Sequence, residues 1–267
     1  MFTDLIASLT SPSAYRRFAG EKPLRTAAYT AFLSLIFVVA LSVAIRIRLT
    51  PLFDQTFDWL KTTMPAITFS AGKLTSTAPT PTLVEHPRFK EVAVMIDTSR
   101  TEPVTAAQMK DAKALAYLTS NALYMERDGR LEVFDLSKSA SAKTITVDAQ
   151  SYGEMERVFN WVFYPLVILF FFVIFCISLC FFAAIYGLAG MLVASLTGAE
   201  LGFGALLKLA LHAQSAAVLL RAVDALSPAR IPSAWAVSLA LSMTYLTLGS
   251  RPAGRPDPAR TPPAPAA

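Results

Sequence analysis

The feature that most constrains this chain is a long apolar stretch, residues 158–199, in which no side chain carries a charge. The hydrocarbon core of a bilayer is about 30 Å thick, and roughly 20 helical residues cross it. As one straight helix the stretch would reach roughly 63 Å, about twice that thickness. We therefore predict an integral membrane protein with a transmembrane helix at about residues 161–184. Residues 185–204, which contain several glycines, would form a helical extension, a bend or an interfacial segment.

Three further segments favour an α-helical membrane protein with about four transmembrane helices. Residues 27–46 predict the first helix, because this segment begins too far into the chain for a signal peptide and lacks a small-residue cleavage site. Residues 205–223 and 231–249 predict the third and fourth helices. Residues 159–249 would thus form the main membrane domain. The composition agrees, since 54% of the 267 residues are hydrophobic and 16% are charged.

Basic side chains flank both ends of the predicted membrane region and decide its expected orientation. They are Arg16, Arg17, Lys22 and Arg25 before the first helix, and Arg251, Arg255 and Arg260 after the last one. Because basic flanks tend to stay in the cytoplasm, both termini are expected there, with residues 47–158 outside the inner membrane of a bacterial cell. Residues 1–26 would be a cytoplasmic flank, and residues 250–267 a disordered tail. The net charge of +5 reflects this topology and does not indicate nucleic-acid binding.

The N-terminal flank has two features of its own. Residues 1–9 place apolar side chains at helical spacing, which suits a helix lying on the membrane surface. The cluster of Tyr15, Arg16 and Arg17 that follows is typical of an ordinary juxtamembrane flank at the headgroup layer.

Residues 47–158 predict an extracytoplasmic α+β domain inserted between the first and second membrane helices. Thr105 and Gln108 have the spacing of a capping box at the start of a helix, and Asp128 with Gly129 predicts a hairpin turn. The other expectations are an amphipathic helix at 53–60, a strand and turn at 66–74, a loop at 75–87, a buried strand at 91–98, a helix at 105–118, hairpin strands at 122–126 and 130–134, and a strand at 143–147.

The third predicted membrane helix contains a candidate intramembrane polar site. Lys208 and Arg221 lie near its two ends and can extend to the headgroups, and Asp224 can pair with Arg221. His212 and Gln214 are deeper, so they are expected to face the helix bundle. Hydrogen bonding between helices is the favoured interpretation, and a polar path for a solute or a proton is the alternative.

Asp97 with Thr98, at the end of a predicted strand, is the candidate site of the outer domain. Turn capping is the favoured role of Asp97, because no nearby histidine or second carboxylate completes a mechanism, and an envelope enzyme is the alternative. His86 lies in a Pro-bounded loop and is expected at the surface. Cys176 and Cys180 are interpreted as packing residues and not as metal ligands. Without a recognisable catalytic, cofactor-binding or metal-binding motif, the sequence predicts no enzyme, no cofactor and no metal.

Four segments carry a resemblance to a known family, and they are residues 9–15, 64–74, 94–98 and 207–213. Their patterns and order resemble a bacterial membrane family, domain of unknown function 1189, which includes a membrane protein encoded in some maltodextrin-utilisation operons. The resemblance implies an inner-membrane protein with one exported domain, and it brings no established reaction. The chain departs from the family pattern at residues 198–202 and 214–216, where a basic stretch and a proline are usual.

Together these features lead to a functional hypothesis. The chain is expected to be a non-enzymatic, multi-pass inner-membrane protein that acts as an adaptor or accessory subunit of a membrane or transport complex. Its expected partners are the lipid bilayer and either another membrane protein or a second copy of the chain, and not nucleic acid. The alternative is an oligomeric small-solute transporter or channel component with a polar path on the third membrane helix.

Overall fold

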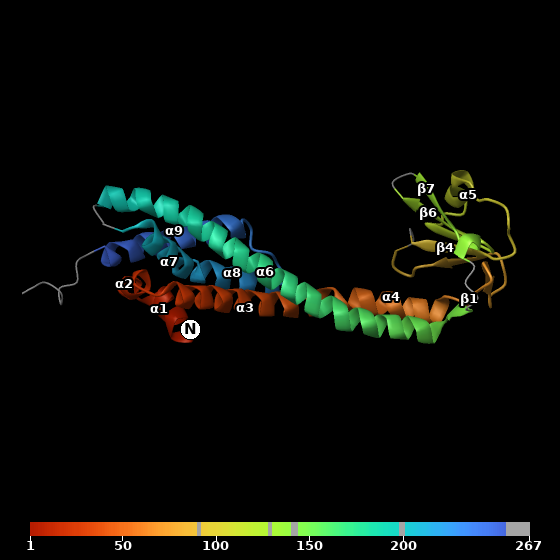
Figure 1. Cartoon of the computed structure of the whole chain (residues 1–267), viewed down its shortest axis with the longest axis horizontal. Helices are drawn as coiled ribbons and strands as arrows, with labels where there is room; N and C mark the ends of the chain where they lie inside the picture. Colours follow the sequence, from red (N-terminus) through yellow and green to blue (C-terminus); the bar gives the residue numbers. More distant parts are fainter. Residues whose placement is uncertain (90–91, 128–129, 140–143, 198–200, 255–267) are drawn as a thin grey trace, which may run out of the picture. The chain divides into compact units, whose positions relative to one another are not determined.

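The chain forms two compact units in the computed structural model, and each is described by itself. The helical unit comprises Met1–Ile47 and Tyr164–Ala267, and the sheet unit comprises Arg48–Phe163. Figure 1 draws the helices and strands of both units, with labels on some of them. The structure describes residues 1–89, 92–127, 130–139, 144–197 and 201–254.

The described part of the helical unit is built from helices. They are α1 (Phe2–Thr10), α2 (Ala14–Ala19), α3 (Pro23–Arg48), α6 (Ala149–Thr197), α7 (Phe203–Ala213), α8 (Ser215–Leu226) and α9 (Ala234–Ala253), of which α6 begins in the sheet unit. One apolar cluster joins them, and its members include Leu5 of α1, Phe18 of α2, Leu33 of α3, Leu179 of α6, Leu209 of α7, Val218 of α8 and Leu246 of α9. Helix α9 contacts α2, α7 and α8, so the short N-terminal helices belong to the packed core.

Helical segments of membrane-spanning length and composition occur at Pro23–Thr63, Ala149–Leu196 and Phe203–Leu226. They include the first three predicted spans. The predicted fourth span, residues 231–249, lies largely within α9, but α9 is not among the segments that meet this measure in the described chain. The structure therefore supports a mainly helical protein that can cross a membrane, with three spans of this kind.

Helix α6 shows how the long uncharged stretch is accommodated, because it continues as one helix over Ala149–Thr197. Its glycines lie against neighbouring helices. A Cβ on Gly187 would meet Phe203 of α7 at 3.3 Å, and a Cβ on Gly190 would meet leucine side chains of α7 and α9 at 3.3 Å. The extension beyond the predicted span is therefore helical and packs on other helices, while residues 198–200 lie outside the described chain.

The N-terminal helices correct the expectation of an ordinary juxtamembrane flank. Helix α1 forms where it was predicted, with Phe2 exposed and Leu5 buried. Tyr15 is buried within the helical unit. The physical reason is a close approach of two helices, because the ring of Tyr15 occupies the space that a side chain on Gly249 of α9 would need.

The sheet unit combines two β-sheets with short helices. Its helices are α4 (Thr50–Thr63), α5 (Ala106–Asp111) and the 3-10 helix η1 (Ser137–Ser139), and its strands are β1 (Ile67–Ser70), β2 (Lys73–Ser76), β3 (Thr82–Glu85), β4 (Ala93–Asp97), β5 (Ala116–Thr119), β6 (Ala122–Arg127), β7 (Arg130–Asp135) and β8 (Ile145–Val147). The strand orders are β2-β1-β8 and β3-β4-β5-β6-β7, with β4 and β5 parallel and the other pairs antiparallel. Ile96 packs with Trp59 and Leu74 on one face of the larger sheet, and Met109 of α5 packs with Tyr117 in a second cluster.

Several predictions for the sheet unit are confirmed and two are wrong. The capping box of α5, the strand β4 and the hairpin strands β6 and β7 are present, while the turn residues 128–129 lie outside the described chain. The predicted loop at 75–87 contains β3, which pairs with β4. The predicted helix at 105–118 ends at Asp111, because Ala116 and the residues after it pair in parallel with β4. Pairing between distant segments thus outweighs a weak helical pattern.

Candidate functional site

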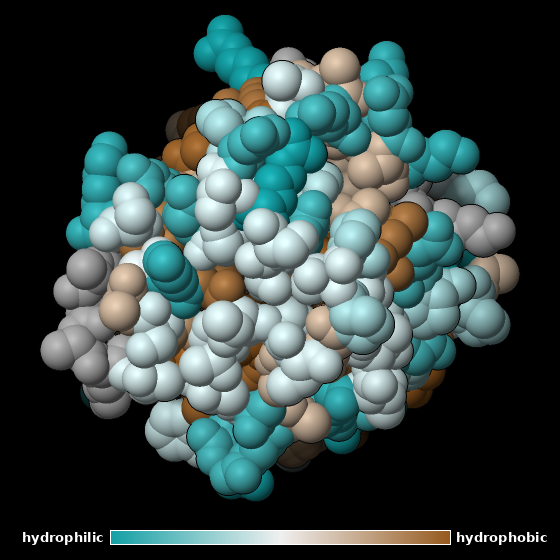
Figure 2. Space-filling model, turned by 90° about the vertical axis from the view of Figure 1, so that its right-hand side faces the viewer, coloured by the Kyte–Doolittle hydropathy of each residue, from teal (hydrophilic) through white to brown (hydrophobic). Residues whose placement is uncertain are grey.

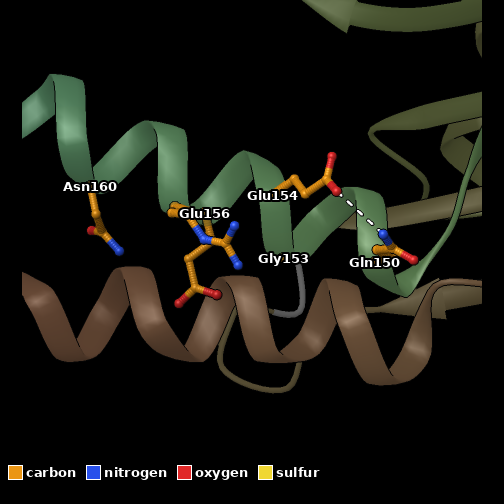
Figure 3. A pocket seen from close by; sticks show the side chains of 6 residues that line it. Gln150, Gly153, Glu154, Glu156 and Asn160 are labelled. Atoms are coloured by element: carbon orange, nitrogen blue, oxygen red, sulfur yellow. Dashed lines mark hydrogen bonds between the residues drawn. The ribbon is translucent and has the colours of Figure 1, made fainter.

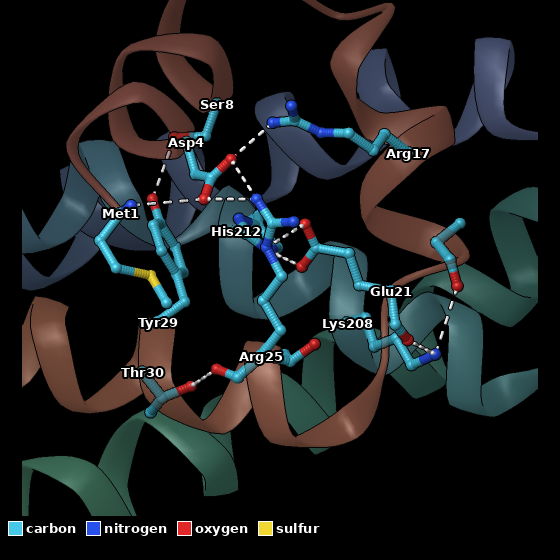
Figure 4. A network of polar contacts seen from close by, with 12 residues as sticks. Met1, Asp4, Ser8, Arg17, Glu21, Arg25, Tyr29, Thr30, Lys208 and His212 are labelled. Atoms are coloured by element: carbon cyan, nitrogen blue, oxygen red, sulfur yellow. Dashed lines mark hydrogen bonds and ion pairs between the residues drawn. The ribbon is translucent and has the colours of Figure 1, made fainter.

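A polar network joins helices α1, α2, α3 and α7 inside the helical unit (Figure 4). Its members, called the N-terminal network below, are Asp4, Arg17, Glu21, Arg25, Lys208 and His212. The network brings together carboxylates, permanent cations and an imidazole from segments 187 residues apart in the chain. Buried charges need partners of this kind, because an isolated charge in a low-dielectric environment is strongly unfavourable.

Asp4 lies at the centre of the N-terminal network, with 2% of its side chain exposed. Arg17 Nη2 donates to its Oδ1 at 2.5 Å, and Arg25 Nη2 donates to Oδ1 and Oδ2 at 3.1 and 3.0 Å. The amino group of Met1 adds an ion pair at 3.6 Å. Burial by itself raises the pKa of Asp4, but the hydrogen bond from Arg25 and the charges of Arg25 and Arg17 outweigh burial and hold the pKa below its usual value. The ionised carboxylate therefore fastens α1 to α2 and α3.

Glu21 is a second buried carboxylate, placed between α2 and α3. Its Oε1 lies 3.3 Å from Arg25 Nε, an ion-pair distance without hydrogen-bond geometry, and its Oε2 lies 3.3 Å from His212 Nε2. Burial raises the pKa of Glu21, although the charges of Arg25 and Arg17 act in the opposite direction. Asp4 and Glu21 thus both contact Arg25, but the pKa of Asp4 is lowered and the pKa of Glu21 is raised. Neighbouring carboxyl groups whose pKa values are shifted in opposite directions also occur at functional sites.

His212 is stacked between two aromatic rings and only 1% of its side chain is exposed. Its ring centroid lies 3.8 Å from that of Phe18 at an interplanar angle of 3°, and 4.1 Å from that of Tyr29 at 24°. Its Nε2 faces Glu21, and its Nδ1 finds no hydrogen-bond partner within the described ranges. The hydroxyl groups of Tyr29 and Ser215 share a hydrogen bond of 2.7 Å beside it. The imidazole is thus enclosed by side chains of α2 and α3 and contacts the carboxylate that precedes α3.

Lys208 belongs to the same network, and its ammonium group is engaged by the chain itself. Its Nζ donates to the carbonyl oxygen of Glu21 at 2.5 Å and to that of Ala19 at 3.4 Å. Both carbonyls lie at or just beyond the end of α2, where helix carbonyls lack partners within the helix, so the ammonium group caps α2. The structure therefore brings Lys208 and His212 together at Glu21.

Gln214 lies apart from the N-terminal network. It stands at the junction of α7 and α8, where its Nε2 donates to the carbonyl oxygens of Leu179 at 3.1 Å and Ala210 at 3.3 Å. One of these carbonyls belongs to α6, so the amide connects the junction to a neighbouring helix. This is hydrogen bonding between helices of the kind that membrane bundles use.

Arg221 is also separate from the network, on the second half of the same membrane segment. Its guanidinium carbon lies 6.0 Å from the ring centroid of Phe182 in α6. The expected pair with Asp224 does not form among the described residues, because Asp224 Oδ1 instead accepts the backbone N–H of Ile231 at 2.6 Å. The four polar residues of the predicted intramembrane site therefore do not form one cluster. Lys208 and His212 belong to the N-terminal network, whereas Gln214 and Arg221 lie outside it.

A small cavity lies beside Gln214 and Arg221. It has a volume of about 10 Å³, and its lining includes Leu179, Tyr186, Gln214, Arg221, Ser238 and Ser242. We call it the Ser238 cavity. The two serines come from α9 and were not singled out in the sequence. Their spacing of four residues, continued by Leu246 and Ser250, is the signal that could have indicated one buried face of α9.

A family model described as "Protein of unknown function (DUF1189)" matches residues 2–249. The chain belongs to the DUF1189 family. This confirms the resemblance inferred from the sequence, and the match runs from α1 into α9, so it includes the N-terminal network and the Ser238 cavity. No curated protein and no solved structure matches the chain. The family supplies no activity, so the site must be interpreted from its own geometry.

Sequence reasoning missed Asp4 and Glu21 in this DUF1189 chain. Both are acidic residues within an otherwise basic N-terminal flank. That contrast could have identified them as partners of the nearby arginines. Their burial could not have been foreseen, because it depends on the packing of α1 and α2 against helices that come much later in the chain.

The candidate site of the sheet unit is a capped carboxylate. Asp97 ends β4, where its Oδ1 accepts a hydrogen bond from Ser99 Oγ at 2.6 Å and its Oδ2 accepts one from the Tyr117 hydroxyl at 3.3 Å. Thr98 lies in the turn that follows and is half-buried. Both oxygens of Asp97 are thus engaged locally, which is the geometry of a strand-end cap.

His86 corrects the expectation of a surface histidine, because only 3% of it is exposed. Its Nδ1 accepts the backbone N–H groups of Arg88 at 3.2 Å and Phe89 at 3.1 Å, and its ring lies 5.0 Å from that of Trp59. The unexpected strand β3 ends just before His86 and draws it into the core.

The surface of the DUF1189 chain is mixed in polarity where Figure 2 shows it. Figure 2 shows one face of the molecule, where hydrophilic and intermediate side chains predominate and hydrophobic ones form separate small areas. An open hollow on α6 is lined by Gln150, Gly153, Glu154, Glu156, Arg157 and Asn160 (Figure 3). Its lining comes from one helix and mixes both signs of charge, and Glu156 already pairs with Lys61 of α4 at 3.0 Å.

Metal ligands are not assembled within the described ranges, where no group of three or more His, Cys, Asp or Glu residues could hold an ion. Cys176 and Cys180 are free thiols on α6. Cys176 is half-buried and Cys180 is exposed.

Proposed function

We propose that this DUF1189 chain is a multi-pass protein of the bacterial inner membrane that serves as a non-enzymatic adaptor or accessory subunit of a membrane complex. In this proposal residues 47–158 lie outside the membrane and are offered to a partner, while both termini are cytoplasmic. The observation that carries it is the use of polar side chains for internal contacts. Asp4, Lys208 and His212 hold helices together through ion pairs, hydrogen bonds and ring stacking with residues of neighbouring helices.

The surface of α6 supports a role within a larger assembly. In its most apolar window only 17% of the residues are buried inside the chain. Large side chains such as Leu166, Phe170 and Phe181 are exposed. In a bilayer such a surface contacts lipid or another membrane helix, so α6 can accept a partner without any rearrangement of the core.

The charge distribution supports the proposed orientation. Basic residues precede α3 and follow the apolar part of α9. If α9 is the fourth crossing, both basic flanks lie in the cytoplasm, as the positive-inside tendency favours. The sheet unit, which follows the first span, then lies outside.

Site-specific photocrosslinking in cells tests the adaptor proposal. A photoreactive residue in place of Phe134 on β7 or Phe170 on α6, both exposed, should give discrete adducts with another protein or with a second copy of the chain. The same residue in place of Leu24, exposed at the predicted cytoplasmic start of α3, is the control and should not give the same adducts. A purified protein that is monomeric in mild detergent and gives no discrete adduct from either position would remove the support for an adaptor.

The alternative function is an oligomeric small-solute transporter or channel component, in which Gln214 and Arg221, two polar residues of the third predicted span that line the Ser238 cavity, would contribute to a polar path. His212→Leu separates the two proposals. A packing role predicts lower thermal stability or altered assembly, because the substitution removes the contact with Glu21 between two aromatic rings. A polar path predicts lost solute flux in proteoliposomes from a variant that remains stably inserted.

A further inference from the structure

Two guanidinium groups of the N-terminal network lie side by side and remain half-exposed. Arg17 Nη2 and Arg25 Nη2 donate to the same oxygen of Asp4, so the two groups meet at one point (Figure 4). The side chains of Arg17 and Arg25 are 53% and 48% exposed. Both arginines therefore keep N–H donors at the surface while they hold Asp4 inside.

Residues 1–26 carry more positive charge than they balance among themselves. Their basic residues are Arg16, Arg17, Lys22 and Arg25, and their acidic residues are Asp4 and Glu21. Arg16 and Lys22 are exposed and form no ion pair within the described ranges. The complementary occupant of this surface is therefore an anion.

Exposed apolar side chains adjoin the two arginines. Phe2 and Ile6 of α1 are 70% and 61% exposed, and Leu24, next to Arg25 at the start of α3, is 81% exposed. The ring centroid of Phe2 lies 4.8 Å from that of Phe32 in α3. Phe32 follows Arg25 by seven residues, about 10 Å further along the helix. The arginines thus mark the polar edge of the apolar segment, and α1 presents apolar side chains beside it.

Phosphate matches the paired guanidinium groups, because arginine forms bidentate hydrogen bonds to its oxygens. A free phosphate ion would leave the apolar side chains uncovered, whereas a phospholipid also supplies acyl chains. We propose that Arg17 and Arg25 bind the phosphate of an anionic phospholipid, such as phosphatidylglycerol, in the cytoplasmic leaflet, with its acyl chains against α1. This inference rests on the proposed membrane orientation and not on the adaptor role.

Lipid-dependent thermal unfolding of the full chain in detergent tests this inference. Phosphatidylglycerol should raise the unfolding midpoint relative to phosphatidylcholine with the same acyl chains. The rise should saturate and reach roughly 3–6 °C when the lipid is about tenfold above its Kd. Arg17→Gln should abolish most of this rise, while Asp4 keeps Arg25 as its partner. Each variant is compared with itself in the two lipids, so a general loss of stability cancels.

Arg230→Gln is the matched control, because Arg230 is exposed between α8 and α9, and this variant should retain the rise. Native mass spectrometry is the second measurement, in which the natural protein should retain more phosphatidylglycerol than phosphatidylcholine. Leu24→Glu adds a negative charge next to Arg25 at an exposed position, so it should lose this preference. Leu24→Gln, which adds no charge, should keep it.

Equal midpoints and equal retention in the two lipids, or an equal rise in Arg17→Gln and Arg230→Gln, would overturn the proposal. A rise with inorganic phosphate alone would indicate a free-ion site and would also overturn it. Recovery of the protein in carbonate-washed membranes measures membrane insertion separately. Recovery there without any preference for phosphatidylglycerol would remove the lipid site and leave the membrane proposal intact.

Discussion

At the residue scale, the contact between Tyr15 and Gly249 decides how α2 lies on α9. A Cβ on Gly249 would overlap the ring of Tyr15, which is buried and cannot move into solvent. Gly249→Ala should therefore destabilise the protein by at least about 2 kcal/mol, because overpacking a core forces helices apart. A lower midpoint of thermal unfolding in detergent is the measurement.

Gly153→Ala is the matched control, since Gly153 is also helical and a Cβ there meets nothing within 4 Å. Alanine favours helix over glycine by about 0.5–1 kcal/mol, so this substitution should leave stability unchanged or raise it. Equal losses from both substitutions would contradict a specific contact between α2 and α9.

Glu21 predicts a dependence of stability on pH. Its pKa is raised above the ordinary value of 4.5, so the folded protein binds the proton more tightly than the unfolded chain does. The tighter proton binding at Glu21 adds to the free energy of unfolding below pH 4.5, and this contribution is lost as the pH rises through the folded-state pKa. Glu21→Gln, which stays neutral, should therefore lose less stability than the natural protein between pH 4.5 and neutrality. Each tenfold change in proton affinity corresponds to about 1.4 kcal/mol.

Thermal unfolding across this pH range measures the effect, with Glu85→Gln as the control. Glu85→Gln removes an exposed carboxylate of β3, so the difference between the two variants isolates the effect of Glu21. If Glu21→Gln lost stability more steeply with rising pH than the natural protein, burial would not be the dominant influence on the pKa of Glu21.

The sequence predicted part of the polar site. His212 and Lys208 stood out because a histidine and a lysine are unusual within an apolar helix, and both prove to contact Glu21. Their partners were not predicted, since Asp4 and Glu21 are ordinary surface residue types and only tertiary packing buries them. The stacking of His212 between Phe18 and Tyr29 likewise requires three helices whose arrangement no local pattern specifies.

At the scale of elements, the carboxylate of Asp4 links α1 to the start of α3. Removing its charge in Asp4→Asn leaves Arg17 and Arg25 without their shared carboxylate. Amide hydrogen exchange in α1 and α2 should then rise by roughly tenfold or more, because these short helices depend on tertiary contacts for stability.

Hydrogen exchange with mass spectrometry on the full chain gives this measurement. Asp54→Asn is the control, because Asp54 is exposed on α4 and its substitution should not change exchange in α1. If α1 exchanged equally in both variants, the carboxylate of Asp4 would not be what holds it.

Elements with strong local signals were the ones that the sequence predicted. The capping box of Thr105 and Gln108 is formed by neighbouring residues, and it is present at the start of α5. Strands β3 and β5 were missed because each is defined by pairing with β4. The apolar stripe through Met109 and Ala116 suggested one long helix, but Ala116 and the residues after it pair in parallel with β4.

At the scale of the whole molecule, a mixed α and β segment interrupts a helical one. The sheet unit is one continuous stretch, and the helical unit is assembled from the chain on both sides of it. The contrast between apolar and mixed composition predicted this insertion. It could not predict which helices pack together, because an apolar stretch is equally suited to contact lipid or protein.

An exported sheet unit on a membrane-embedded helical unit is the central proposal, and labelling of single cysteines tests it most directly. With Cys176 and Cys180 replaced by alanine, a cysteine is introduced at exposed Glu102 of the sheet unit or, as the matched position, at exposed Lys22 before α3. A membrane-impermeant maleimide applied to intact cells should label Glu102→Cys, and it should label Lys22→Cys only after the cells are opened. Labelling of Lys22→Cys in intact cells, with Glu102→Cys protected until the cells are opened, would contradict the proposed topology and the adaptor function that depends on it.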